Sequence, residues 1–319
     1  MYFPYLRGRQ YELIGIREAI KAGVVSSKII PIIEPVKLSS TLLSTIKVSV
    51  VEKKEVAVIC NSAIPSFLDD FDSLEKEKEK KEYLEILKNN NIIKAFLVKN
   101  NWKKELENYK ELLNLNEKDI MLICNDVNFV DEVVEKYNNN FPRYNLIPEE
   151  KRFRRKITKN KILLEDRFIK EDRNSDYLKN IDDFFSEDHL FYTEDNYEGF
   201  SDYLTIGEKY VDGGFAPYAV AIHITYLDEK DNSIRIHHFV SDSNDDIKDP
   251  AKKFYEALTK LVEFKFPESS KTRALEKFYE YYENQSYPGL GSIKKLSLLH
   301  HIELVNNFLE LKGKENENM

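Results

Sequence analysis

The chain has 319 residues, a net charge of −8 and a pI of about 5.5. An acidic balance argues against general nucleic-acid binding, because neutralising phosphates needs concentrated Lys and Arg. Hydrophobic residues make up 42% and charged residues 33% of the chain, which excludes a disordered protein. Ten Gly and ten Pro are too few for an all-β protein with many tight turns.

The compartment is also constrained by the sequence. The first residues contain no basic stretch followed by an apolar one, so we expect no signal peptide. No apolar run reaches about eighteen residues, so we expect no membrane span. Cys60 and Cys124 lie inside apolar runs, which favours buried free thiols over a disulfide. The sequence therefore predicts a cytoplasmic protein.

Short apolar runs alternate with longer amphipathic segments over the first 170 residues. Each run is apolar on both faces, as in the buried strands of a parallel sheet. The predicted strands are residues 2–6, 28–34, 56–61, 93–98, 120–125, 144–147, 161–165 and, as an eighth, 203–206. The predicted helices between them include residues 11–22, 74–88, 106–115 and 129–137. Repeated strand and helix at this spacing predicts an α/β fold of the (β/α)8-barrel type.

A different pattern begins after residue 215. Residues 218–226 and 234–240 flank a polar turn and predict a β-hairpin. Asp249 followed by Pro250 predicts a helix start, and two more helices are expected from about Thr272 and Ser292. The expected organisation is a barrel-like domain over residues 1–215, a hairpin over 216–248 that is part of the barrel or packs on it, and a helical extension over 249–319.

Two stretches resemble a known family. Residues 5–13 (Tyr-Leu-Arg-Gly-Arg-Gln-Tyr-Glu-Leu) and 30–35 (Ile-Pro-Ile-Ile-Glu-Pro) resemble the start of the T-even phage beta protein family. Residues 199–207 and 218–223 are similar to a second block in its uncharacterised bacterial relatives. The resemblance implies a shared fold and a phage-conflict or mobile-element setting. It implies no chemistry, and it carries over no site residues.

Polar residues at the carboxyl ends of the predicted strands are the first candidate site, because barrel enzymes keep their chemistry there. Carboxylates in that place can bind a divalent metal or act as acid and base, and an Arg beside them can hold an anionic ligand. The alternative is that these residues only shape solvated loops. The candidate catalytic residues are Glu34, Asp126, Glu165, Asp166 and Arg167.

Histidines on the predicted hairpin are the second candidate. With the turn centred near residue 230, His223 is expected opposite His237 across the two strands. With Asp202, they would form a metal site, although the spacing matches no standard ligand motif. Histidines that pack in the sheet are the alternative reading. The cofactor is therefore left open, with a divalent metal as the candidate.

One dense basic stretch, residues 151–156, is the third candidate. Arg152, Arg154 and Arg155 could contact nucleic-acid phosphates, with Phe153 available for stacking on a base. The alternative is a solvated basic loop.

Three functions remain open from the sequence. No nucleophile-elbow motif, zinc-protease helix, calcium loop or phosphate-binding glycine loop occurs in the chain. The favoured hypothesis is therefore a binding or scaffold protein with a protein partner. The alternatives are a barrel enzyme of the hydrolase or phosphodiesterase type and a nucleic-acid-binding protein.

Overall fold

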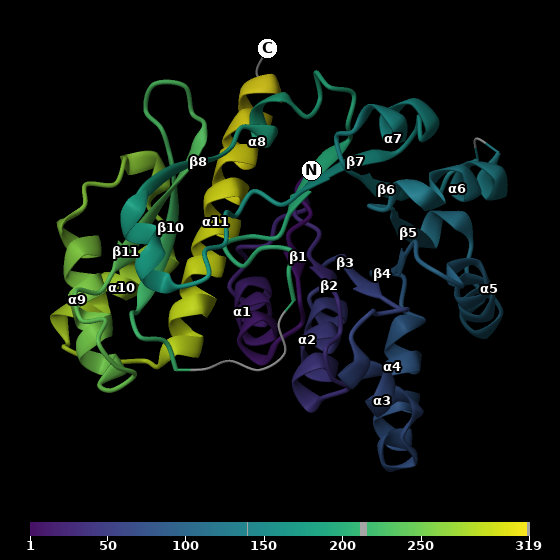
Figure 1. Ribbon diagram of the computed structural model, residues 1–319. Helices are drawn as coiled ribbons and strands as arrows, with labels where there is room; N and C mark the ends of the chain where they lie inside the picture. Colours follow the sequence, from purple (N-terminus) through teal and green to yellow (C-terminus); the bar gives the residue numbers. More distant parts are fainter. Residues whose placement is uncertain (139, 211–215, 318–319) are drawn as a thin grey trace. The chain divides into compact units, whose positions relative to one another are not determined.

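The computed structural model describes residues 1–138, 140–210 and 216–317 (Figure 1). The chain divides into two compact units. The barrel unit comprises Met1–Glu165 and Phe191–Asp202, and the sheet–helix unit comprises Asp166–Leu190 and Tyr203–Met319. These bounds differ from the expected three-part organisation, since the hairpin and the C-terminal helices share one unit with a segment inserted between two barrel strands. The expected boundary at residue 215 lies outside the described residues.

The barrel unit contains a sheet of eight parallel strands, which confirms the predicted fold class. Each strand is buried over most of its length, and helices surround the sheet. The strands in sheet order are β1 (Tyr5–Leu6), β2 (Ile32–Ile33), β3 (Val56–Ile59), β4 (Ile92–Leu97), β5 (Ile120–Ile123), β6 (Tyr144–Ile147), β7 (Lys161–Glu165) and β9 (Gly199–Asp202).

The segment just before β1 bridges β9 and nearly closes this sheet. Tyr2 and Phe200 form a parallel bridge, and the Phe3 N–H donates to the Phe200 carbonyl at 2.8 Å. Gly199 is required here, because a Cβ at that position would lie 2.6 Å from the Met1 carbonyl oxygen. The stacked rings of Tyr2 and Phe200, 5.0 Å apart, fill the space beside the bridge.

The predicted eighth strand, residues 203–206, is wrong. The strand that completes the barrel is β9, four residues earlier, and residues 204–206 form a turn. Leu204 has a φ of 55°, in the left-handed region that no strand residue occupies. The apolar pattern of Tyr203 to Ile206 reflects burial of a turn, whereas β9 carries only one large apolar residue, Phe200.

Amphipathic helices follow most barrel strands. In α1, Leu13, Ile16 and Ile20 are buried, as the sequence pattern predicts. Helix α2 was not predicted because its Ser, Thr and Val residues are poor helix formers, but the Ser39 hydroxyl caps it by accepting the Leu42 N–H at 3.2 Å. The helices are α1 (Gln10–Lys21), α2 (Ser40–Val51), α3 (Pro65–Asp72), α4 (Glu77–Leu87), α5 (Trp102–Leu113), α6 (Val130–Tyr137) and α7 (Lys151–Lys156).

The sheet–helix unit is built on three antiparallel strands in the order β10-β11-β8. The hairpin of β10 (Ala221–Leu227) and β11 (Ile234–Val240) confirms the sequence pattern. The third strand, β8 (Asp182–Ser186), was not predicted and comes from the segment inserted between β7 and β9. The other elements are the 3₁₀ helices η4 (Asn174–Lys179) and η5 (Glu268–Ser270) and the helices α8 (Asp188–Phe191), α9 (Pro250–Glu263), α10 (Arg273–Glu283) and α11 (Leu290–Glu317).

One face of this small sheet forms the core of the unit with the C-terminal helices. Ile222, Ile224 and Phe239 pack with apolar residues of α9, α10 and α11. Helix α9 begins as predicted, with the Asp249 carboxylate accepting the Lys252 N–H at 3.0 Å and Pro250 in the first turn. The C-terminal helices are therefore part of this core and do not form a separate layer.

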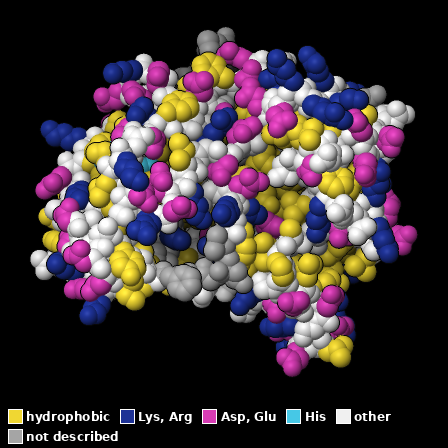
Figure 2. Space-filling model, in the orientation of Figure 1, with side chains coloured by type: hydrophobic (Ala, Val, Ile, Leu, Met, Phe, Trp, Pro, Cys, Tyr) yellow, Lys and Arg dark blue, Asp and Glu magenta, His cyan; other side chains and the backbone are white. Residues whose placement is uncertain are grey.

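No helix in the described residues is both long and apolar enough to cross a membrane. Both cysteines are buried and free, as predicted, and burial raises the pKa of each thiol to about 12. Figure 2 shows Lys and Arg side chains interspersed with Asp and Glu on the face drawn.

Candidate functional site

Glu34, at the end of β2, is held in a buried hydrogen-bond network. Its side chain is 1% exposed and forms an ion pair with Arg7. The Tyr5 hydroxyl donates to it at 2.9 Å, and the Ala63 N–H donates at 3.2 Å. Gly8 (φ 60°) permits this close packing, since a Cβ there would lie 2.5 Å from the Glu34 carbonyl oxygen. These contacts tie β1, β2 and the loop after β3 together.

The other predicted carboxylates each bind backbone N–H groups of nearby loops. Asp126 accepts the Asn128 N–H at 2.9 Å and caps the following turn. Glu165 accepts the Glu149 N–H at 2.8 Å. Asp166 accepts N–H groups from Phe168 at 3.2 Å and Glu208 at 2.8 Å. Each carboxylate thus has a local structural role.

Arg167 forms a bidentate ion pair with Asp188 at the start of α8. The two nitrogen–oxygen distances are 2.8 and 2.6 Å, and the Asp188 side chain is 9% exposed. The predicted catalytic set is divided between the units, because Glu34, Asp126 and Glu165 belong to the barrel unit, whereas Asp166 and Arg167 belong to the sheet–helix unit.

The basic stretch forms the short helix α7. Arg152 pairs with Asp131 at 2.8 Å and Arg154 with Glu149 at 3.4 Å, while Arg155 is exposed. Phe153 is fully buried, so the expectation that it stacks on a base is wrong. Its ring packs under the helix and leaves only polar side chains on the outer face.

The histidines on the hairpin take a different register from the predicted one. His223 lies opposite His238, and His237 lies opposite Ile224. Neighbouring side chains of a strand point to opposite faces, so His237 and His238 serve two separate networks. Asp202 lies in the barrel unit and accepts the Tyr2 hydroxyl proton at 2.8 Å. In the described part of the chain, no three His, Cys, Asp or Glu side chains are grouped to hold a metal ion.

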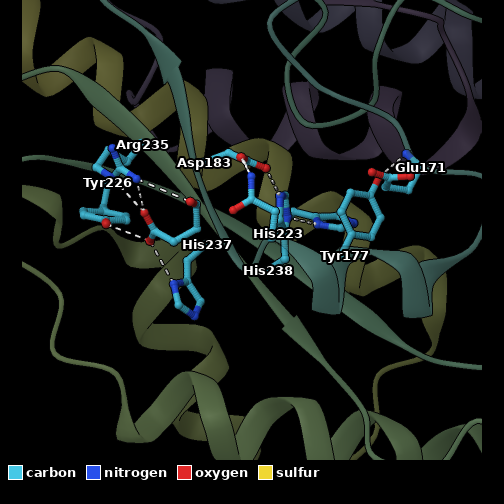
Figure 3. A network of polar contacts seen from close by, with 10 residues as sticks. Glu171, Tyr177, Asp183, His223, Tyr226, Arg235, His237 and His238 are labelled. Carbon is cyan, nitrogen blue, oxygen red and sulfur yellow. Dashed lines mark hydrogen bonds and ion pairs between the residues drawn. The ribbon is translucent and has the colours of Figure 1, made fainter.

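Three polar side chains form a relay across all three strands of the small sheet (Figure 3). Nδ1 of His223 on β10 and Nδ1 of His238 on β11 are 2.7 Å apart, so the N–H of one ring donates a hydrogen bond to the other ring. On its other side, His238 Nε2 lies 3.5 Å from the Asp183 carboxylate of β8. We call Asp183, His238 and His223 the histidine relay.

Aromatic rings enclose the relay. Tyr177 lies 4.6 Å from the His223 ring and 4.5 Å from the His238 ring, and the Phe168 ring lies 5.2 Å from His223. Burial, followed by the charge of His238, lowers the pKa of His223 well below its ordinary value. Burial, followed by the charge of His237, lowers the pKa of His238 to about 4. Both rings are therefore neutral near pH 7.

Two neutral rings can share one hydrogen bond with either ring as the donor. With Nδ1–H of His223 donating to His238, the remaining proton of His238 is on Nε2, the nitrogen nearer Asp183. Burial, and then the neighbouring Asp182 charge, raise the pKa of Asp183. His223 Nε2, which makes no hydrogen bond with any described residue, then keeps its lone pair. It can accept a hydrogen bond.

A second network lies on the opposite face of the sheet (Figure 3). Asp182 of β8 accepts hydrogen bonds from Tyr226 at 2.8 Å, Arg235 at 2.7 Å and His237 at 2.9 Å. Burial acts to raise the pKa of Asp182, but the bonds from His237, Tyr226 and Arg235 outweigh it and hold that pKa below its usual value. Both faces of β8 are thus anchored to the hairpin.

The two edges of the small sheet differ. The β10 edge is covered, because His300 Nε2 of α11 donates to the Thr225 carbonyl at 2.6 Å and the Ser270 hydroxyl accepts the Leu227 N–H at 2.9 Å. Strand β8 is at the other end of the strand order, with no strand paired beyond it among the described residues. Sequence reasoning missed β8 because its five residues lie in a polar segment, where the Phe184–Phe185 pair was the one apolar signal.

No family model matches the chain, and the comparisons with curated proteins and with solved structures likewise found no match. The fold therefore defines the class: an α/β protein with a (β/α)8-barrel-like unit and an added antiparallel sheet with helices.

Proposed function

We propose that this protein is a binding or scaffold protein that takes an extended segment of a partner protein on the open edge of β8. The observation that carries the proposal is the contrast between the two edges of one sheet. Side chains of α11 and η5 occupy the backbone groups of β10, whereas β8 ends the strand order. An open strand edge is a template for an added strand.

The register identifies the backbone groups that an added strand would use. The His238 N–H donates to the Ile181 carbonyl at 2.8 Å, so His238 and Ile181 form a hydrogen-bonded pair. In an antiparallel ladder every second residue points its backbone groups away from the partner strand. On β8, Asp182 and Phe184 therefore direct their N–H and C=O groups away from β11. The Asp182 carbonyl has a long contact of 3.4 Å from Arg235. A bulge before Ser186 limits the open stretch to about four residues.

Apolar side chains flank this open edge. Ile181 is 47% exposed and Phe184 is 51% exposed, and they point to opposite faces of the sheet. Leu178 of η4 is 53% exposed. Covering one such half-exposed side chain contributes about 1 kcal/mol to binding. The histidine relay and the Asp182 network fix β8 in register, so the partner does not have to order the strand.

Charge favours a basic partner over a second copy of this chain. Asp182 and Asp183 precede the Phe184–Phe185 pair, and Glu187 and Asp188 follow it. Asp182 and Asp188 are paired with Arg235 and Arg167, so Asp183 and Glu187 carry the charge that antiparallel pairing of two β8 strands would bring together. Like charges across strands are destabilising. A segment with alternating apolar residues and Lys or Arg at its ends complements the edge.

The proposed setting is a phage-conflict or mobile-element system in the cytoplasm. The resemblance of residues 5–13 and 30–35 to the T-even phage beta protein family supports the setting. Two buried free thiols support a reducing compartment.

The experiment is a selection from a displayed library of random linear peptides on the full chain. We expect enriched peptides that alternate apolar residues and carry basic ends. Phe184→Pro should abolish their binding, because proline removes an N–H that points out of the sheet and leaves the bonds to β11 in place. Phe184→Ala keeps that N–H and should weaken binding by only about tenfold.

The controls separate the alternatives. Thermal melting of Phe184→Pro should remain close to that of the unchanged chain. Failure to enrich any peptide, or full binding by Phe184→Pro, would overturn the proposal. A dimer in solution that dissociates on the same substitution would replace the partner with a second copy of the chain.

A further inference from the structure

A basic pocket lies at the amino-terminal end of the barrel strands, within the barrel unit. Its volume is about 730 Å³, and residues just before or early in β4, β5 and β6 line it. Four basic side chains and one acidic side chain line the pocket, in a chain whose net charge is −8. They are Lys88, Lys94, Lys118, Arg143 and Asp119.

Lys94 is the central residue of this pocket. It is the third residue of β4, and it is 2% exposed. Its ammonium group donates to the Asn89 carbonyl at 3.2 Å, and no other hydrogen bond or ion pair to a described residue uses its remaining protons. Burying an ammonium without a carboxylate partner is costly, and burial lowers the pKa of Lys94. A bound anion would compensate this charge.

The acidic residue in the pocket, Asp119, is an electrostatic neighbour of both Lys94 and Lys118. Asp119 accepts the Asn116 N–H at 2.9 Å and its side-chain amide at 3.0 Å. Lys118 forms no ion pair within the described residues. Arg143 and Lys88 have partners outside the pocket lining, Glu55 at 2.6 Å and Glu85 at 2.7 Å. Lys94 and Lys118 share the single charge of Asp119, so the lining keeps an excess of positive charge on these two lysines.

We propose that this pocket binds the phosphate group of a small molecule, with Lys94 and Lys118 as its cationic contacts. Ammonium groups bind phosphate as point charges, and the side-chain amides of Asn90 and Asn114 in the lining can donate further hydrogen bonds. The volume is in the range of small-molecule sites and admits a nucleotide. The site is independent of the β8 edge and lies at the opposite end of the strands from the predicted catalytic carboxylates.

The test is calorimetric titration of the full chain with inorganic pyrophosphate and, separately, with ADP. We expect binding that weakens with added salt and a higher melting temperature at saturating ligand. Lys94→Met removes the charge at similar volume, and Lys118→Ala changes an exposed residue, so at least the second variant keeps the fold. Each should weaken binding by about tenfold or more.

The matched control is Lys81→Ala, because Lys81 lies on the neighbouring helix α4, is 75% exposed and does not line the pocket. Its affinity should equal that of the unchanged chain. Equal affinities for the two probes would assign the site to the phosphate group alone, and tighter binding of ADP would add contacts to the nucleoside. No heat and no stabilisation with either probe, or unchanged affinity in both pocket variants, would overturn the proposal.

Discussion

The two units place their polar side chains in different chemical roles. All six histidines of the chain lie in the sheet–helix unit, and the sequence of the barrel unit contains none. In the barrel unit, permanent charges such as Glu34 and Arg7 join strand ends. In the sheet–helix unit, buried imidazoles add to charged pairs such as Asp182 and Arg235 in joining strands, and His300 joins α11 to the Thr225 carbonyl. The stability of the sheet–helix unit should therefore depend on pH in the acidic range where histidine binds a proton.

Acidification is expected to have the largest effect. Burial lowers the pKa of His189, His238 and His300 to about 4 from an ordinary value of 6.5. Since the unfolded chain binds these protons more readily, stability is full above pH 6.5 and falls as the pH drops towards 4. Each histidine contributes about 3 kcal/mol to this loss. Limited proteolysis at decreasing pH should cut the sheet–helix unit progressively faster.

A conservative variant sharpens this prediction. His300→Gln keeps an amide donor towards the Thr225 carbonyl but cannot take up a proton, so its stability should depend less steeply on pH between 6.5 and 4. An acid dependence as steep as that of the unchanged chain would show that His300 does not carry the effect.

Removing the Arg167 charge is the next largest change. Arg167→Met leaves the Asp188 carboxylate buried without its bidentate partner, and the free energy of unfolding should fall by about 3 kcal/mol. Urea denaturation measures this loss. The double variant Arg167→Met with Asp188→Leu should recover most of it, because no buried charge remains. Unchanged stability of the single variant would return Arg167 to the list of ligand-binding candidates.

Glu34→Gln tests the barrel unit with a smaller effect. The amide keeps an acceptor for Tyr5 and loses the ion pair with Arg7, so we expect a loss of about 2 kcal/mol. Trp102 is the only tryptophan and is buried in this unit, so its fluorescence reports the unfolding directly. A gain in stability would instead mark Glu34 as a strained functional residue.

Breaking an exposed ion pair on α7 is expected to have the smallest effect on stability. Arg152 and Asp131 are both more than half exposed, so Arg152→Ala should change stability by less than about 1 kcal/mol. The nucleic-acid hypothesis is checked in the same variant. A fall in affinity for short RNA at low salt would support that hypothesis, which the present account does not expect.

The barrel was predictable from its sequence because buried parallel strands carry continuous apolar runs. The hairpin was predictable because a polar turn separates two β-rich segments. Strand β8 was not predictable, since its pairing partner β11 follows about fifty residues later and its Asp-Asp-Phe-Phe-Ser sequence has no clear alternation. The histidine relay was not predictable for the same reason, because Asp183 of β8 reaches His238 only when β8 pairs with β11.

The histidine register failed for a related reason. A shift of one residue in the pairing moves a side chain to the other face, and the turn length that sets the pairing is not written in the strand pattern. His237 was therefore assigned to the face that His238 occupies. Glu165 ends β7, and its backbone partner, the Glu149 N–H, depends on a loop conformation that the strand pattern does not contain.

The most direct test of the open-edge account is amide hydrogen exchange on the chain without any partner. The account predicts that the Phe184 amide of β8 exchanges much faster than the Leu227 amide of β10, which the Ser270 hydroxyl covers. Equal protection of the two amides would mean that the β8 edge is already occupied, and this would contradict the proposed strand-binding function.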